Sequence, residues 1–69
     1  MPLTMAGIGE VNRIIKISGK DEVRKHLETL GFITGETVMV VSKFSGNLIL
    51  QIKESRIALD RSMANRIMV

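Results

Sequence analysis

The chain has 69 residues, of which 45% are hydrophobic and 25% are charged, and its formal net charge is +3 at pH 7. A domain of this size buries only about 60% of the surface that its unfolded chain exposes, which excludes large catalytic architectures such as a doubly wound sheet. The chain has no cysteine, which excludes a disulfide scaffold, a thiolate metal site and a cysteine nucleophile.

The first predicted element is a strand over residues 8–17, a segment rich in β-branched side chains. Apolar side chains fall on both of its alternating faces, so we expect this strand to bend or to be covered on both sides. Ser18 stands three residues before Asp21, which is the spacing of a capping box at the start of a helix.

A helix is predicted at about residues 20–30, because Val23, Leu27 and Leu30 have the i, i+4, i+7 spacing of one helical face. Gly31 directly follows this apolar stripe, and we expect it to end the helix in the left-handed conformation. About three turns of helix are not stable alone in water, so the stripe must pack against a sheet.

Four further strands are predicted after the helix, and a turn at Ser45–Asn47 joins the first two of them into a hairpin. A short helical turn is expected at about residues 61–64, with Asp60 as its N-cap. The four strands are predicted over residues 37–42, 48–52, 56–59 and 66–69.

Regular alternation places Val38, Val40 and Ser42 on one face of the first hairpin strand. Small antiparallel sheets tend to close on themselves, because closure removes exposed strand edges. The sequence therefore predicts a mainly β fold, a small SH3-like five-stranded β-barrel with one inserted α-helix. The barrel is expected as a single domain over residues 1–69.

No membrane-spanning segment is expected, since the longest apolar run is Val38–Val41 and a spanning helix needs about 20 apolar residues. The first residues lack the basic start and the apolar stretch of a signal peptide. We therefore expect a soluble, cytoplasmic protein with no membrane insertion.

The spacing of these residues resembles the FeoA family, the small cytosolic component of bacterial ferrous iron transport. Its most specific segment runs from the helix into the next strand, as Leu27-x-x-Leu30-Gly31-Phe32-x-x-Gly35. The resemblance covers nearly the whole chain, from about residue 3 to the last residue. The other matching residues are Gly9, Val11, Ile14, Ile17, Arg24, Val38, Val40, Gly46, Ala58, Leu59, Ala64, Ile67 and Val69.

This resemblance implies an SH3-like barrel with a non-enzymatic accessory role in ferrous iron uptake. The implied partner is FeoB, the membrane permease with a cytosolic GTP-binding domain, which this protein would bind and modulate. Surface residues beside the helix and its following loop are the expected contacts, namely Arg24, Glu28 and Phe32, with Phe44 and Arg61 as further candidates. Exposed strand edges would also be compatible with a homo-oligomer.

No catalytic, cofactor-binding or metal-binding residues are predicted. His26 is the only histidine and Glu22 precedes it by four residues, whereas a transition-metal site needs three or four converging ligands. The resemblance implies an association with transition metal ions, but the sequence shows no set of residues that would form a complete metal site. A serine–histidine–acid triad has few ways to assemble around one histidine, and the glycines lack the lysine of a Walker motif.

Two other functions stay open at this stage. One is a small RNA-binding β-barrel, but such barrels stack bases on several aromatic side chains, and this chain has only Phe32 and Phe44. The other is a module that senses a metal or ligand, because DtxR-type repressors carry the same barrel as their C-terminal domain.

Overall fold

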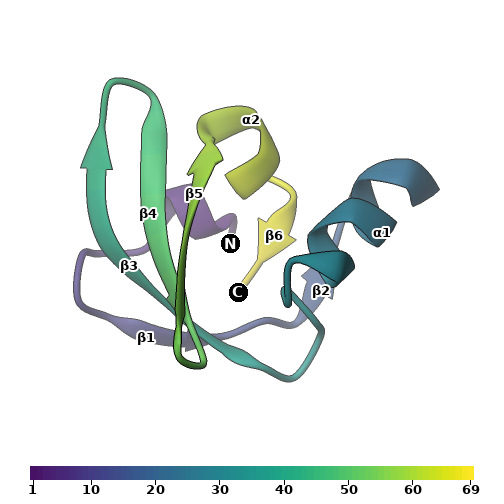
Figure 1. The fold of residues 1–69 in the computed structure, drawn as a ribbon, viewed down its shortest axis with the longest axis horizontal. Helices are drawn as coiled ribbons and strands as arrows, with labels where there is room; N and C mark the ends of the chain where they lie inside the picture. Colours follow the sequence, from purple (N-terminus) through teal and green to yellow (C-terminus); the bar gives the residue numbers. More distant parts are fainter.

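The computed structural model describes residues 1–69, and it confirms a mainly β, SH3-like fold. A four-stranded antiparallel sheet in the order β1-β3-β4-β5 faces a two-stranded sheet of β2 and β6 (Figure 1). The five strands expected in one barrel are therefore six strands in two sheets, and the barrel is not closed. The elements are η1 (Leu3–Met5), β1 (Val11–Arg13), β2 (Lys16–Ile17), α1 (Asp21–Thr29), β3 (Thr37–Phe44), β4 (Asn47–Ile52), β5 (Ser55–Asp60), α2 (Arg61–Ala64) and β6 (Ile67–Met68).

The extra strand arises because the segment predicted as one strand over residues 8–17 divides between the two sheets. Its first part, β1, pairs with β3, and its second part, β2, pairs with β6. The backbone changes partner at Ile14, whose N–H donates to Glu36 (2.9 Å), and at Ile15, whose N–H donates to Met68 (2.8 Å). The expected bend is thus a transfer of the chain from one sheet to the other.

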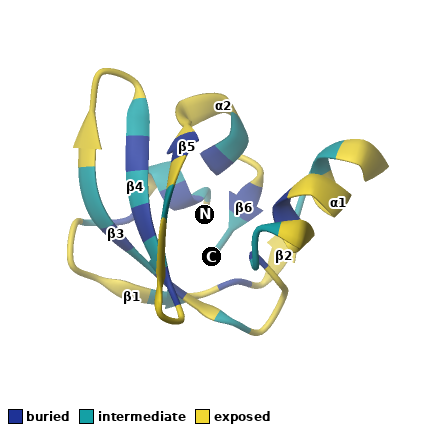
Figure 2. Ribbon diagram, in the orientation of Figure 1, coloured by how far each residue is buried: buried dark blue, intermediate teal, exposed yellow.

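The core is a single cluster of 13 buried residues, all of them apolar (Figure 2). Strand β4 shows the alternation most regularly, because Leu48, Leu50 and Ile52 are buried and the residues between them are half-buried. No helix in the structure has the length and the apolar character needed to cross a membrane.

A β-bulge at Val41 interrupts the pairing of β3 with β4. Val40 lies opposite Leu50, but the next pair along the ladder is Ser42 with Ile49. One extra residue on one strand reverses the phase of its alternation beyond the bulge. The prediction that Ser42 shares a face with Val38 is therefore wrong.

Helix α1 confirms the predicted helix, but the capping box at its start is wrong. Lys20 is the N-cap, and no side chain caps the first turn. Ser18 remains part of the β2–β6 pairing, since its N–H and its hydroxyl both donate to the carbonyl oxygen of Arg66 (2.7 and 3.2 Å). Ser18 thus lies two residues before the N-cap, and its hydroxyl is used in the sheet instead of capping the helix.

The C-terminal end of α1 forms a Schellman motif around Gly31, which confirms the predicted left-handed residue (φ 106°). The Gly31 N–H donates to Glu28 (2.9 Å), and the Phe32 N–H donates to Leu27 (3.0 Å). Leu27 and Phe32 are both fully buried, so the motif turns the chain directly into the core.

Replacement of Leu27 by alanine tests whether the apolar stripe of α1 attaches the helix to the sheets. We expect Leu27→Ala to lower the free energy of unfolding by roughly 2–5 kcal/mol, because a fully buried side chain leaves a cavity. Urea denaturation would measure this loss, with Lys25→Ala as a control on the exposed face of the same helix. Equal stability of the two variants would show that α1 does not depend on this contact.

Candidate functional site

The largest hollow on the surface, about 270 Å³, lies where three elements meet. Thr4 belongs to η1, Lys43 and Phe44 lie at the end of β3, and Arg61 is the first residue of α2. The remaining lining residues form the turn and the start of β4: Ser45, Gly46, Asn47 and Leu48. We call this site the tip hollow.

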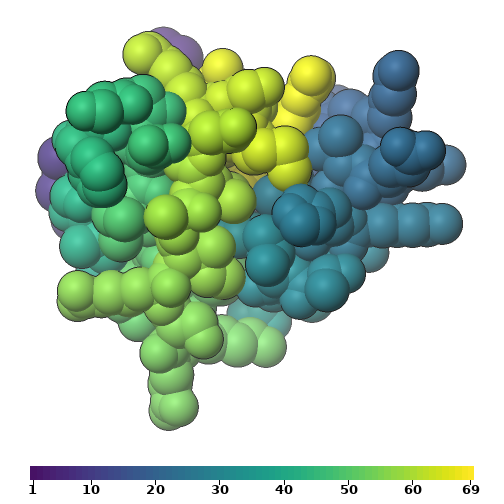
Figure 3. Space-filling view, turned by 45° about the horizontal axis from the view of Figure 1, so that its top comes forward, coloured from purple at the N-terminus to yellow at the C-terminus, as the bar shows by residue number.

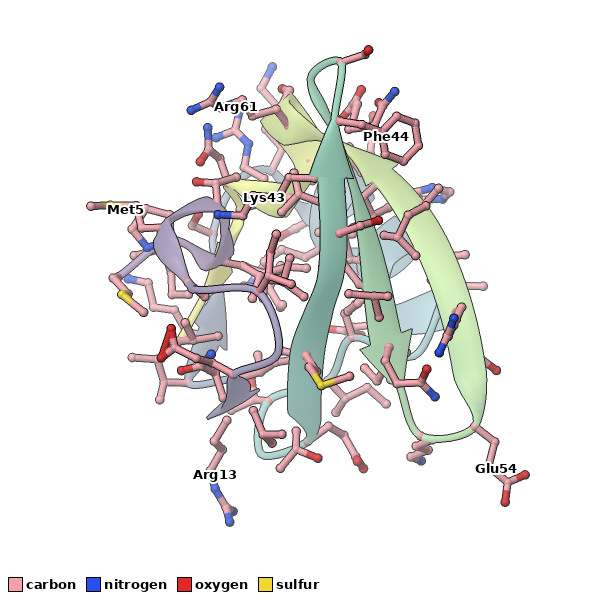
Figure 4. All side chains as sticks on the ribbon, turned by 90° about the vertical axis from the view of Figure 1, so that its left-hand side faces the viewer. Met5, Arg13, Lys43, Phe44, Glu54 and Arg61 are labelled. Carbon is pink, nitrogen blue, oxygen red and sulfur yellow. The ribbon has the colours of Figure 1, made fainter.

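The bulge at Val41 places Lys43 on the side of the tip hollow. Beyond the bulge, Lys43 lies opposite Leu48 and Phe44 lies opposite Asn47. Side chains of paired residues share a face of the sheet, so Lys43 is on the same face as the buried Leu48 and Phe44 is on the other. Figure 4 shows this arrangement, with Lys43 extending toward η1 and Phe44 projecting from the opposite side of the hairpin.

The hairpin tip has a defined turn geometry. Phe44 and Asn47 form a backbone pair, which leaves Ser45 and Gly46 as a two-residue loop. Both loop residues have positive φ (45° and 78°), as a type I′ hairpin turn requires. The carbonyl oxygen of Gly46 accepts the N–H of Arg61 (2.8 Å), which fixes the tip to the start of α2.

Helix α2 is short, and Asp60 caps it as predicted. The Asp60 carboxylate accepts the N–H of Met63 (2.8 Å). Thr4 donates its hydroxyl hydrogen bond to Asn65, which joins η1 to the end of α2. These two contacts fix the backbone from which Arg61 projects.

Lys43 and Arg61 bring two positive charges to the tip hollow, and no carboxylate forms an ion pair with either one. The structure has only two ion pairs, which join Arg24 to Asp21 and Lys53 to Glu36. The Lys43 ammonium donates one hydrogen bond, to the carbonyl oxygen of Thr4 (3.0 Å). The Arg61 side chain makes no hydrogen bond within the chain, so its guanidinium is available to a ligand.

The predicted contact residues fall into two separate surfaces. Phe44 and Arg61 both line the tip hollow. Arg24 and Glu28 lie on the outer face of α1, where they line a smaller polar depression. Figure 3 shows the hairpin in green and α1 in blue at opposite ends of one face of the molecule.

Phe32 does not belong to either surface. It was expected among the contact residues, but its side chain is fully buried in the core. Phe32 follows α1 closely in the sequence, which suggested that it lies at the surface beside the helix. The Schellman motif instead turns the chain inward at this point. Phe32 therefore supports the loop after α1 from inside.

Lys43 and Thr4 were not among the contact residues predicted from the sequence. Regular alternation places Lys43 on the same face as Met39 and Val41, and no pattern in the sequence brings η1 over the hairpin. The only local signal was the polar residues Lys43, Ser45 and Asn47, and of these Ser45 and Asn47 were interpreted as part of a turn.

No group of three or more histidine, cysteine, aspartate or glutamate side chains converges in the structure. His26 lies exposed on α1, one turn after Glu22. These two side chains could offer a metal ion at most two ligands, so the residues present do not form a complete transition-metal site.

A second kind of surface follows the N-terminal segment and β1, where large apolar side chains are exposed. They include Met5, Ile8, Val11 and Ile15. Strand β1 is at the edge of its sheet and pairs only with β3. This segment is the part of the surface on which the expectation of a homo-oligomer rests, and that expectation stays a prediction.

The model of the FeoA domain family matches residues 1–69 of the chain. No curated protein sequence matches it. Among solved structures, an iron uptake regulatory protein (FeoA) has a TM-score of 0.89 and 25% identity, over 97% of this chain and 91% of the other. FeoA of Stenotrophomonas maltophilia in complex with zinc, described as a procaryotic SH3 domain protein, has a TM-score of 0.86 and 27% identity, over 99% and 87% of the two chains.

A manganese-dependent transcriptional repressor also shares the fold. Its TM-score is 0.85 at 17% identity, and the match covers 97% of this chain but only 39% of the repressor. At this identity the likeness shows the fold alone.

Substitution of Asp60 tests whether the N-cap of α2 holds this corner of the site. We expect Asp60→Ala to lower the free energy of unfolding by about 0.5–2 kcal/mol, because the Met63 N–H loses its acceptor. Asp60→Asn keeps an acceptor oxygen and should retain most of the stability in thermal denaturation. Equal losses in the two variants would show that the side-chain cap is not what stabilises α2.

Proposed function

The chain belongs to the FeoA domain family, which is associated with ferrous iron transport, and we propose that it acts there as a non-enzymatic accessory protein that binds FeoB. The proposed contact is with the cytosolic, GTP-binding part of this membrane permease. Binding would modulate nucleotide turnover or the assembly of the transporter.

The proposal rests on the match of the FeoA domain to the whole chain and on the two charged surfaces of the structure. The domain presents a hairpin tip that is hydrogen-bonded to α2 and an exposed helix face, both carrying charged side chains. Such surfaces suit contact with another protein, since charged groups at the rim of an interface steer association and fix its register.

The surface favours a protein partner over RNA. RNA-binding barrels stack bases on several exposed aromatic side chains. Here Phe44 is the single exposed aromatic residue, at 55% exposure, because Phe32 is buried. One ring at a hairpin tip does not form a stacking surface.

An NMR titration tests the proposal. The ¹⁵N-labelled chain would be mixed with the purified cytosolic domain of FeoB from the same bacterium, with GDP, with a GTP analogue and without nucleotide. We expect localised shift changes at the backbone amides around Arg24 and Glu28, or around Phe44 and Arg61, in at least one nucleotide state. Those two groups report the two candidate surfaces separately.

Absence of shift changes in every nucleotide state would contradict binding to this domain. A gel-shift assay with single-stranded RNA at low salt provides the comparison, because phosphate contacts make affinity fall steeply as salt rises. Salt-sensitive RNA binding without any response to the FeoB domain would favour the RNA-binding function instead.

A further inference from the structure

We propose that the tip hollow binds an acidic segment of the partner protein, with carboxylates of that segment paired to Lys43 and Arg61. This inference rests on the proposed function, since it names the chemistry of the surface that the partner would present. It assigns the contact to one of the two candidate surfaces, the hairpin tip and α2.

The first argument is that two cationic side chains from different elements converge on one hollow. Lys43 comes from the end of β3 and Arg61 from the start of α2, and both line it. Figure 4 shows both on the same side of the β3–β4 hairpin. The ammonium of Lys43 keeps two N–H donors beyond its bond to Thr4, and the planar guanidinium of Arg61 matches a carboxylate in two-point geometry.

The second argument is that no carboxylate of the chain neutralises these charges. Asp60 is adjacent to Arg61, but its carboxylate accepts the Met63 N–H and does not line the hollow. Glu10, the one acidic residue of the N-terminal segment, accepts the N–H of Gly7 instead. Two like charges without a counter-charge repel each other, and the attraction of both to an incoming carboxylate offsets that repulsion.

The third argument is that the hollow is already formed in the free protein. Two hydrogen bonds join its lining residues, Lys43 to Thr4 (3.0 Å) and Arg61 to Gly46 (2.8 Å), and Thr4 is also bonded to Asn65 at the end of α2. A rigid site loses little conformational entropy when it binds, so more of the interaction energy appears as affinity.

The size of the hollow and its neighbours favour a peptide over a nucleic acid. About 270 Å³ accommodates a few side chains, which is just below the roughly 300–1,000 Å³ that is usual for ligand pockets. Met5 is 70% exposed on the same side of the hairpin as Lys43, whereas the Phe44 ring lies on the opposite side (Figure 4). Met5 is not one of the lining residues, so the site itself offers two charges, and no aromatic surface for a base because the ring of Phe44 points to the other side.

Charge reversal tests this assignment with the full chain. The binding of the FeoB cytosolic domain would be measured for the wild type, for Lys43→Glu with Arg61→Glu, and for the milder pair Lys43→Gln with Arg61→Gln. The control pair is Arg13→Glu with Lys16→Glu, which makes the same charge change on β1 and β2. Arg13 lies at the far end of the molecule from the hollow (Figure 4). Two-dimensional NMR spectra would establish that each variant is folded.

We expect the charge-reversed tip variant to bind at least about 10-fold more weakly than the wild type and the control pair. The glutamine pair should lose less, and wild-type binding should weaken as salt rises from about 50 to 500 mM. Wild-type affinity in the charge-reversed tip variant would overturn the inference and leave the proposed function intact. No binding by the wild type itself would instead contradict the proposed function.

A second titration separates the sources of negative charge. The probes are a short synthetic peptide of alternating glutamate and leucine, its glutamine counterpart, a single-stranded oligonucleotide and inorganic phosphate. The inference predicts shift changes at Lys43 and Arg61 with the glutamate peptide and not with its glutamine counterpart. Shift changes at these residues with the oligonucleotide or with phosphate, but not with the glutamate peptide, would overturn it.

Discussion

The pairing of β3 with β4, with its bulge at Val41, is the constraint on which the rest of the structure depends. Before the bulge, this pairing brings Val38, Val40 and the buried side chains of β4 to the centre of the core. Strand β1 pairs with one side of this unit and β5 with the other. After the bulge, the same pairing presents Lys43 to η1 and α2, so one irregularity connects the core to the candidate site.

Much of this fold follows from local patterns in the sequence. The alternation of Leu48, Leu50 and Ile52, the cap at Asp60 and the left-handed Gly31 are each determined by neighbours within a few residues, and the structure confirms them. The membership of Phe44 and Arg61 in one hollow was not predicted as such, although both residues were named. Local interactions determine the conformation at these positions, because a turn or a cap uses only backbone groups that are close in sequence.

The features that the sequence did not predict depend on partners far away in the chain. The chain changes sheets at Ile14 and Ile15, because their N–H groups find acceptors at Glu36 and Met68 respectively. Ser18 bonds to Arg66 rather than to the helix that follows it. The bulge has no signature of its own, since an extra residue in a β-branched strand looks like one more position of alternation. Lys43 was missed for this reason, and Thr4 was missed because no sequence pattern places η1 beside the hairpin.

The two candidate surfaces differ in whether their positive charges are paired. On the face of α1, Arg24 forms an ion pair with Asp21, whereas the two cations of the tip hollow, Lys43 and Arg61, form no ion pair.

The most direct test of this account is the set of cross-strand nuclear Overhauser effects between β3 and β4 in solution. The bulged register predicts contacts between Lys43 and Leu48 and between Ser42 and Ile49. Contacts between Ser42 and Leu48 and between Lys43 and Asn47 would show a regular ladder, which would turn Lys43 away from the hollow and contradict the account.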